Sequence, residues 1–326
     1  MPVPPPVLYP PFNIVRLSHV EYRVKDLARS RAFYVDTLGL QVSHEDASSL
    51  YLRAMEERGH HSIKLVKSGT SEVGVLGFKL YDEPDLEKAE AFFAGKGLPT
   101  EWVENPYMGK TLRTRDPWGV PLEFYVQMDR LAPIHQQYKL YNGVRPLRID
   151  HFNMFSADVD ASVAFYNEIG FRTTEYTEDE ESGKVWAAWM HRKGGVHDVA
   201  FTNGTGPRLH HTAFWVPSAL SIIDLLDLMA TTGWVDSIER GPGRHGISNA
   251  FFLYIRDPDG NRIEIYVSDY QTVDPDLEPI KWDLKDPQRQ TLWGAPAPRS
   301  WFEEGSEFAG AELSEPALKA QPIIAP

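Results

Sequence analysis

An internal repeat constrains the fold of this 326-residue chain more than any other feature. The segment that begins at Arg16, RLSHVEYRVKDLARSRAFYVDTLGL, returns from Arg148 as RIDHFNMFSADVDASVAFYNEIGF. Further along, DPWGVPLEFYV from Asp116 returns as DPDGNRIEIYV from Asp257. The first pair is offset by 132 residues and the second by 141, so the second copy holds nine extra residues. A duplication of this size, roughly 130 residues per copy, predicts two similar folded units.

Each copy has the same order of predicted elements, a strand followed by a helix and then further strands. Helical spacing of apolar residues predicts helices at 27–39 and 162–170, which end at glycines, and second helices at 86–97 and 218–233. Apolar, β-branched segments predict strands at 49–55, 61–67 and 73–81, and again at 184–191, 197–203 and 210–216. The tetrapeptides DPWG and DPDG are turns that lead into the last strand of each copy. The pattern predicts an α+β fold built of repeated βαβββ modules.

The repeat also predicts the domain limits. We expect an N-terminal domain at residues 1–140, a C-terminal domain at 141–270 and a C-terminal extension or lid at 271–326. Residues 268–326 match nothing in the first copy and contain many prolines, and we expect them to pack over the second domain. For residues 305–326 the alternative is an acidic, mobile tail.

Composition excludes several classes of protein. The net charge is −13 without a basic stripe, which argues against a nucleic-acid partner. No apolar run approaches the ~18 residues that a membrane span requires. The N-terminus, MPVPPPVLYPPFNI, lacks the charged and apolar regions of a signal peptide. The absence of cysteine excludes disulfides and thiolate chemistry, and we expect a cytoplasmic protein.

Two histidines and a glutamate in the second copy form a candidate metal site. His151, His211 and Glu264 each lie on a different predicted strand. A face of two histidines and one carboxylate leaves several metal coordination positions open, which suits an iron-type centre that holds a substrate and O₂ together. A lone histidine is more often a core or surface residue, so the comparison between the two copies carries the argument.

The first copy keeps only part of this set. It retains His19 and Glu123, but aligning Phe78 with Phe214 places Val75 opposite His211. Only the second copy can therefore complete a set of three ligands. Within the segment LHHTAFWV, His210 competes with its neighbour for the middle position, because strand periodicity alone does not choose between them.

The repeated βαβββ module resembles the vicinal oxygen chelate superfamily, and the second half resembles its type I extradiol ring-cleaving dioxygenases. The similar segments are AAWMHRKGGVHD, IERGPGRHGISNAFFLYIRDPDGNRIEIY and KWDLKDPQRQTLWG, and the match covers nearly the whole chain. The resemblance implies paired modules that form open β-barrels, with Fe(II), or Mn(II) as the alternative, in the second domain. It also implies a catechol and O₂ as substrates and a homo-oligomer, a tetramer in related enzymes.

The resemblance further implies roles for single residues. It makes His151, His211 and Glu264 the metal ligands and so selects His211 over its neighbour. It makes His197 the acid–base residue, with hydrogen bonds to the bound catechol from His245 and Tyr254.

Other matching positions contact the substrate. The residues that the resemblance assigns to the substrate pocket are Asn153, Trp189, Arg240, Ser248 and Arg289. Arg240 and Arg289 would bind a carboxylate side arm, since a guanidinium can grip a carboxylate with two hydrogen bonds. Close relatives carry two consecutive arginines at the second of these places, and here Gln290 replaces the latter. Arg244 and Arg262 are expected to be solvated or structural.

Together these features predict an extradiol dioxygenase that inserts both atoms of O₂ into 3,4-dihydroxyphenylacetate. The expected product is 5-carboxymethyl-2-hydroxymuconate semialdehyde. The alternatives are cleavage of another catechol, a glyoxalase-like metal-dependent isomerase, or a non-enzymatic binding module. An isomerase of this superfamily commonly builds a four-ligand site across two modules, which Val75 argues against, and a binding module has no need of a complete ligand set.

Overall fold

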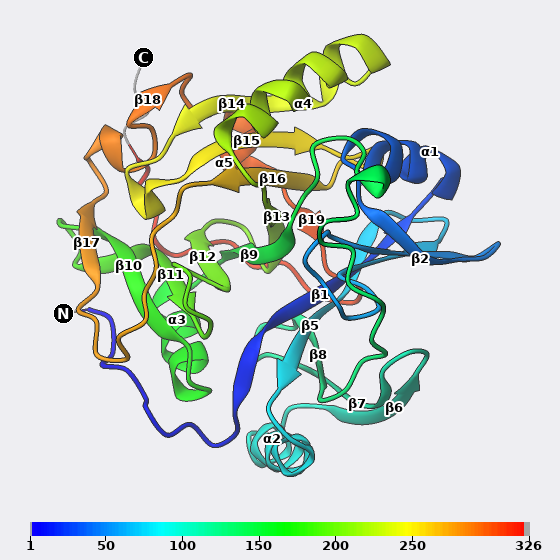
Figure 1. The fold of residues 1–326 in the computed structure, drawn as a ribbon. Helices are drawn as coiled ribbons and strands as arrows, with labels where there is room; N and C mark the ends of the chain where they lie inside the picture. Colours follow the sequence, from blue (N-terminus) through cyan, green and yellow to red (C-terminus); the bar gives the residue numbers. More distant parts are fainter. Residues whose placement is uncertain (1, 323–326) are drawn as a thin grey trace.

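The two copies fold into two sheets with the same internal strand order in the computed structural model, which describes residues 2–322 (Figure 1). The first sheet has eight strands in the order β2-β3-β4-β1-β5-β8-β7-β6. These strands are β1 Ile14–Val24, β2 Gln41–Glu45, β3 Ser49–Arg53, β4 Ile63–Lys67, β5 Glu72–Leu80, β6 Thr100–Asn105, β7 Gly109–Arg115 and β8 Pro121–Tyr125. The longest helix of this half is α2 (Glu83–Gly95), and a 3₁₀ turn, η2 (Tyr138–Leu140), lies in the segment that leads to the second half.

The second sheet repeats this order in its core as β10-β11-β12-β9-β13-β16-β15-β14. Its strands are β9 Arg148–Ser156, β10 Arg172–Asp179, β11 Lys184–His191, β12 Val199–Asn203, β13 Arg208–Trp215, β14 Ile238–Arg244, β15 Phe251–Arg256 and β16 Arg262–Val267. Its helices are α3 (Val159–Glu168) and α4 (Ala219–Thr232), with short 3₁₀ turns η3 (Val235–Ser237) and η4 (Ile247–Asn249). Each half contains two βαβββ units in sequence, which confirms the predicted fold class.

The division between the halves falls in the connection between β8 and β9. The domain limits 1–140, 141–270 and 271–326 stay our proposal. One hydrophobic core runs through both halves, because Phe78 of β5 contacts both Phe152 of β9 and Phe171, with ring centroids 6.2 Å and 5.9 Å away.

The first helix differs from the prediction. The segment expected to be one regular helix is an α-helix, α1 (Leu27–Arg31), followed by a π-helix, η1 (Ala32–Thr37). Phe33 and Phe165 are 132 residues apart but the helix-ending Gly39 and Gly170 only 131, so the first copy holds one extra residue here. A π-helical turn accommodates such an insertion without shifting the flanking elements.

Strand register shows that the two halves superpose residue for residue around the predicted ligands. His19 pairs with Gly77, which pairs with Glu123, and His151 pairs with Ala213, which pairs with Glu264. Val75 lies two residues before Gly77, and His211 lies two residues before Ala213, so the two occupy equivalent places. The register therefore confirms that valine stands in the first half where the second has its middle histidine.

The halves also exchange hydrogen bonds symmetrically. Tyr34 donates to the Asp257 carboxyl at 2.7 Å, and Tyr166 donates to the Asp116 carboxyl at 3.2 Å. Each tyrosine lies shortly after the aspartate that caps the first helix of its own half. The aspartate that accepts its hydrogen bond is the first residue of the DPxG turn in the other half. The two halves are thus joined by a pair of equivalent buried contacts.

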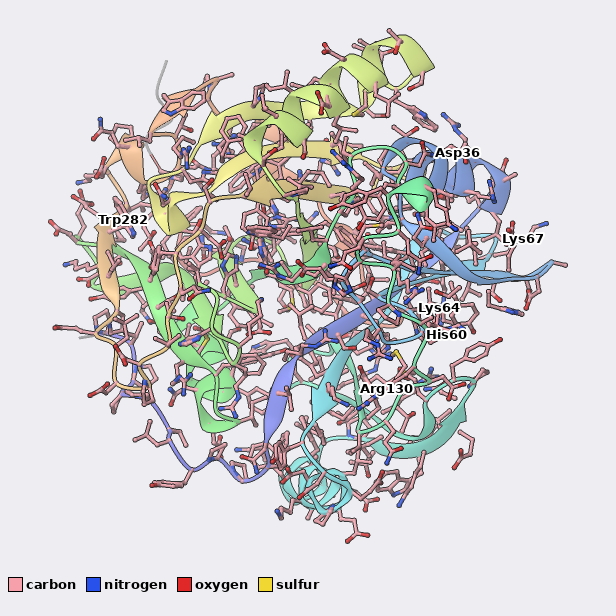
Figure 2. All side chains as sticks on the ribbon, in the orientation of Figure 1. Asp36, His60, Lys64, Lys67, Arg130 and Trp282 are labelled. Atoms are coloured by element: carbon pink, nitrogen blue, oxygen red, sulfur yellow. The ribbon has the colours of Figure 1, made fainter. Side chains whose placement is uncertain are left out.

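The C-terminal extension packs over the second half, as predicted, and also reaches the first. Strand β17 (Ile280–Asp283) lies beside β10, β18 (Trp293–Gly294) beside β14 and β19 (Ser306–Glu307) beside β13. Figure 2 shows Trp282 on β17, on the side of the molecule away from Lys67 of β4. A short helix, α5 (Arg299–Glu303), and a 3₁₀ turn, η5 (Pro287–Arg289), lie between these strands.

Residues 305–322 are not a free tail. Phe308 is buried and bridges to Val73 of the first half, and the backbones of Ser314 and Gly206 exchange hydrogen bonds. Residues 323–326 of the predicted tail lie outside the described residues. None of the helices within residues 2–322 is long and apolar enough to cross a membrane.

Candidate metal centre and its cavity

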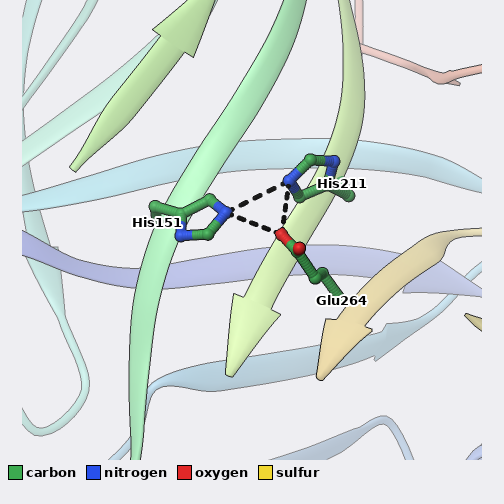
Figure 3. Close-up of side chains that lie close together, drawn as sticks. All are labelled: His151, His211 and Glu264. Atoms are coloured by element: carbon green, nitrogen blue, oxygen red, sulfur yellow. Dashed lines mark hydrogen bonds and ion pairs between the residues drawn. The ribbon is translucent and has the colours of Figure 1, made fainter. Parts of the chain in front are cut away.

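Three neighbouring strands of the second sheet bring His151, His211 and Glu264 together (Figure 3). They come from β9, β13 and β16. The Nε2 atoms of the two histidines are 3.2 Å apart, and Glu264 Oε2 lies 2.9 Å from the first and 3.1 Å from the second. Within residues 2–322 this is the one cluster of histidine, aspartate or glutamate side chains with the spacing of a metal site.

The size of this triangle fits one face of an octahedron. Ligand atoms about 2.1 Å from a metal and at right angles to one another are separated by about 3.0 Å, whereas tetrahedral angles would spread them to about 3.4 Å. The observed edges of 2.9–3.2 Å match the first arrangement. A metal held on one octahedral face keeps three positions for substrate and O₂.

The contacts of the two Nδ1 atoms leave the Nε2 lone pairs of both histidines directed at the centre of the cluster. His151 Nδ1 lies 3.1 Å from an Asp150 carboxyl oxygen, and His211 Nδ1 lies 2.6 Å from His210 Nδ1. If both Nδ1 atoms carry the proton, both Nε2 atoms and the Glu264 carboxylate are acceptors. Burial raises the pKa of Glu264, but the two neighbouring histidines lower it well below its usual value, so the group is a charged carboxylate. Three converging acceptors require a cation, so the donor set fits a divalent metal.

Ten of the predicted site residues line one cavity around this centre. They are His151, His211, Glu264, His197, His245, Tyr254, Asn153, Trp189, Ser248 and Arg289. Because they come from strands β9 to β16 and from the extension, the second sheet must curl around the cavity. Arg240, the remaining predicted site residue, is not part of this lining.

His197 lies against the first predicted ligand. Its ring centroid is 3.8 Å from that of His151, and its Nδ1 is buried without a hydrogen-bond partner in the described structure. Burial, and then the neighbouring His151, lower the pKa of His197 well below its usual value. The imidazole is therefore neutral at pH 7 and can accept a proton.

His245 and Tyr254 form a second pair in the cavity lining. His245 Nε2 and the Tyr254 hydroxyl are 3.1 Å apart, while His245 Nδ1 contacts the carbonyl oxygen of Gln290. Burial and the nearby Arg240 lower the pKa of His245 to about 3, so its single proton lies on the nitrogen that faces the carbonyl. The segment GPGR belongs to β14, and His245 directly follows that strand.

Two further polar residues are held in fixed orientations. The Thr202 hydroxyl donates to Asn153 Oδ1 at 3.1 Å, so the amide nitrogen of Asn153 is left to act as a donor. Ser248 has a left-handed backbone conformation, with a φ of 57°. Its backbone N–H donates to Glu175 at 2.7 Å. Thr202 lines the cavity, but its strand showed no pattern that separates it from a core threonine.

The two predicted carboxylate-binding arginines are buried, being only 3% and 2% exposed. The guanidinium of Arg240 lies among aromatic rings, 4.8 Å from Phe252 and 5.0 Å from Trp301, and donates at 2.8 Å to Thr291. Its Nε and Nη1 have no partner in the described structure. Arg289 lines the cavity, and neither arginine forms an ion pair within residues 2–322.

Residues behind His151 were not predicted. Asp150 accepts hydrogen bonds from His151 and the Tyr266 hydroxyl, and Lys193 Nζ lies 3.4 Å from its carboxyl. The pairing of β9 with β13 is shifted at Asp150, so this residue has no partner in β13. Strand alternation would turn Asp150 away from His151, so the bulge hid this contact from the sequence pattern.

The first half contains a matching but altered cluster. His19 Nε2 lies 2.9 Å from Glu123, as His151 does from Glu264. The pairing of β4 with β1 places His61 where the second half has His197. Arg113 pairs with Glu123 across the sheet, at the position of Tyr254, and donates to that carboxylate at 2.8 Å.

In the first half, the Arg113 side chain takes the place beside the carboxylate that a metal would have in the second half. Burial raises the pKa of Glu123, but hydrogen bonds from His19 and the charge of Arg113 lower it to about 2. The guanidinium therefore supplies the positive charge that the carboxylate needs. Together with Val75, it explains why the first half lacks a metal cluster among the described residues.

Comparison with known proteins agrees with this geometry. The sequence profile of the Glyoxalase/Bleomycin resistance protein/Dioxygenase superfamily matches residues 16–124 and 148–265. A metapyrocatechase of Geobacillus stearothermophilus is 30% identical over 324 residues, which cover 94% of this chain and 98% of that protein. A manganese-dependent 2,3-dihydroxybiphenyl 1,2-dioxygenase of Geobacillus genomosp. 3 is 30% identical over 87% of this chain and 95% of its own length.

Solved structures are more similar still. The homoprotocatechuate 2,3-dioxygenase of Brevibacterium fuscum, in its anaerobic complex with 3,4-dihydroxyphenylacetate, is 44% identical with a TM-score of 0.90. That match covers 95% of this chain and 99% of the other. A room-temperature structure of an extradiol ring-cleaving dioxygenase from the same organism is 43% identical with a TM-score of 0.93, over 98% of this chain and 90% of the other.

Proposed function

The chain belongs to the Glyoxalase/Bleomycin resistance protein/Dioxygenase superfamily and is an extradiol ring-cleaving dioxygenase, and on this premise we propose that it cleaves 3,4-dihydroxyphenylacetate. Its cofactor is Fe(II) or Mn(II), for which His151, His211 and Glu264 are the proposed ligands. The product of cleavage beside the two hydroxyls is 5-carboxymethyl-2-hydroxymuconate semialdehyde.

The observation that carries the choice of substrate is a pair of buried arginines that form no ion pair within residues 2–322. Burial lowers the pKa of both Arg240 and Arg289 to about 10, so both remain charged at pH 7. Arg262, equally buried, differs because Glu239 neutralises it at 2.6 Å. A buried charge without a partner is costly, so these two guanidinium groups favour a ligand that brings a carboxylate.

The two arginines take different positions toward this ligand. Arg289 faces the cavity directly. Arg240 Nη2 donates at 3.3 Å to the carbonyl of Gln290, which does line the cavity, so Arg240 stands one layer behind it. Gln290 Nε2, which has no partner in the described structure, adds a neutral donor to the cavity lining, whereas the Ser248 hydroxyl already donates to the Ile247 carbonyl at 2.6 Å.

The proposed chemistry divides between the metal and the side chains. When bound, the metal supplies a Lewis acid that favours deprotonation of the catechol and open positions for catechol and O₂. His197, neutral and with a free ring nitrogen, takes a proton from a catechol hydroxyl and later returns it during ring opening. The Asn153 amide is oriented to donate to a substrate oxygen.

Hydrogen-bond direction refines the expected role of His245. With its proton on Nδ1, its Nε2 accepts from the Tyr254 hydroxyl instead of donating to the substrate. The single Tyr254 proton is then used, so its hydroxyl oxygen is left to accept from a hydroxyl of the bound catechol, and His245 holds that oxygen in place.

The arginine assignment is tested with substrates that differ in charge. Arg289→Met should lower the preference for 3,4-dihydroxyphenylacetate over 4-methylcatechol by roughly one to two orders of magnitude, because a charged hydrogen bond of about 1.5–3 kcal/mol is lost. Arg240→Met, which removes a charge one layer behind the cavity lining, should lower the same preference by a smaller factor. Activity on 4-methylcatechol should hardly change. The measurement is kcat/KM from the yellow ring-opened product, with Arg244→Met as the control.

Equal wild-type activity on acidic and neutral catechols would contradict the proposed substrate and leave a general extradiol enzyme. The glyoxalase-like alternative is disfavoured because all three proposed ligands come from one half of the chain. We also propose a homo-oligomer, a tetramer, located in the cytoplasm, which light scattering of the pure enzyme and cell fractionation would test.

A further inference from the structure

His210, the residue beside the proposed ligand His211, has no part in the chemistry described above. It is completely buried, and its Nδ1 lies 2.6 Å from Nδ1 of His211. Strand alternation would place neighbouring side chains on opposite faces. Here the register of β13 against β9 shifts between Leu209 and His211, and this bulge lets the two imidazoles meet.

Three hydrogen-bond partners fix where the protons lie. His211 Nε2 faces the metal position, so a ligand at this place carries its proton on Nδ1. The neighbouring His210 Nδ1 must then be the acceptor, which leaves the proton of His210 on Nε2. That nitrogen lies 2.8 Å from the carbonyl oxygen of Trp301, which is an acceptor only. Each contact thus has one donor and one acceptor.

Arg262 holds the backbone of His210 in place. Arg262 donates to the His210 carbonyl at 2.9 Å and to the Glu304 carbonyl at 3.0 Å. The same arginine therefore ties β13 to the segment of the extension that supplies the Trp301 carbonyl.

We propose that His210 is a positioning residue that fixes the tautomer and ring orientation of His211, and that it connects this ligand to α5 of the C-terminal extension. Partners of this kind make a metal-bound imidazole more basic and hold its lone pair on the metal. The Trp301 side chain lines the cavity, so one segment of the extension both shapes the pocket and supports the metal centre.

The first half lacks the ligand and the support together. The pairing of β1 with β5 skips Gly74, so the same bulge is present there. Gly74 stands at the place of His210, and Val75 follows at the place of His211. A Cβ at Gly74 would lie 2.3 Å from a carboxyl oxygen of Glu21, so a larger side chain there would have to displace that carboxyl group. The histidine pair is thus specific to the metal-binding half.

Two substitutions separate the two contacts of His210. In His210→Asn the side-chain oxygen can take the place of Nδ1 and accept from His211, whereas in His210→Gln the amide reaches instead toward the Trp301 carbonyl. We expect His210→Asn to bind Mn(II) nearly as tightly as the wild type and His210→Gln to bind it about 10–100-fold more weakly. Mn(II) titration of the metal-free protein, followed by electron paramagnetic resonance, measures both.

Equal Mn(II) affinity in His210→Gln and wild type, or equal losses in both variants, would overturn the proposal. A second measurement avoids substitution: nitrogen-15 spectra of histidine-labelled wild type loaded with Zn(II) should place the His210 proton on Nε2. A proton on Nδ1 would also overturn it. The inference rests on the metal centre proposed above, and failure of the wild type itself to bind Mn(II) would instead contradict that centre.

Discussion

At the scale of single residues, hydrogen-bond direction determines what each histidine of the cavity can do. His245 has its proton directed at a backbone carbonyl, whereas the buried Nδ1 of His197 has no partner in the described structure. The sequence predicted both histidines from their motifs. It did not reveal the Asp150 and His210 contacts, because both depend on β-bulges that break the alternation on which strand reasoning relies.

His197 offers a direct test of the acid–base assignment. His197→Phe should retain metal and catechol binding but lose roughly two to four orders of magnitude in turnover, the usual contribution of a general acid–base group. Stopped-flow absorbance and metal analysis measure these quantities separately. His61→Phe is the matched control, since His61 occupies the equivalent place in the first half, and it should leave turnover unchanged. An unchanged rate in His197→Phe would make this histidine structural.

At the scale of elements, the repeat predicted which positions of the two halves are equivalent better than it predicted the single strands and helices. Strands at or near the ends of the sheets, such as β6 and β14, were missed, because their half-buried faces give no clear alternation. The π-helix η1 could not be read from apolar spacing, since one inserted residue changes the helix type without changing the pattern of buried residues. The loss of the middle ligand in the first half, by contrast, followed from alignment alone.

The altered row in the first half gives a prediction about metal content. Val75→His should not create a second metal site, because the Arg113 guanidinium still neutralises Glu123. Val75→His/Arg113→Tyr removes that charge and should raise the metal content above one per chain. Metal analysis after dialysis measures both variants. A second metal bound by Val75→His alone would show that the guanidinium does not exclude it.

At the scale of the whole molecule, the two halves depend on each other through the exchanged tyrosine–aspartate contacts. Asp116 is buried where the halves meet and accepts from Tyr166 and from the backbone of its own turn, the N–H groups of Trp118 and Val120. Burial raises its pKa to about 7, far above the value of an exposed carboxyl. The duplication explains why this contact occurs twice, but only the folded structure shows that each pair crosses between halves.

This buried carboxyl predicts a pH dependence of stability. Below about pH 4, Asp116 is protonated in both folded and unfolded chains, so its titration takes nothing from the free energy of unfolding. As the pH rises to about 7 the unfolded chain releases this proton first, so the folded state loses stability, by at most about 4 kcal/mol. Asp116→Asn removes this loss, and its melting temperature relative to wild type should rise from pH 4 to pH 7.

Calorimetric melting curves across this range provide the measurement. Asp36→Asn, at an exposed position, should follow the wild type throughout. A constant difference between Asp116→Asn and wild type at every pH would mean that the Asp116 pKa is not raised in the folded protein.

Extradiol cleavage by this enzyme depends, in our proposal, on one metal held by His151, His211 and Glu264 in the second half. Anaerobic purification with metal analysis, followed by O₂ uptake on 3,4-dihydroxyphenylacetate, tests this dependence. We predict one Fe or Mn per wild-type chain and one O₂ consumed per ring opened, and neither tight metal binding nor turnover in His211→Ala. Metal at one per chain with full turnover in His211→Ala would show that His211 is not a required ligand.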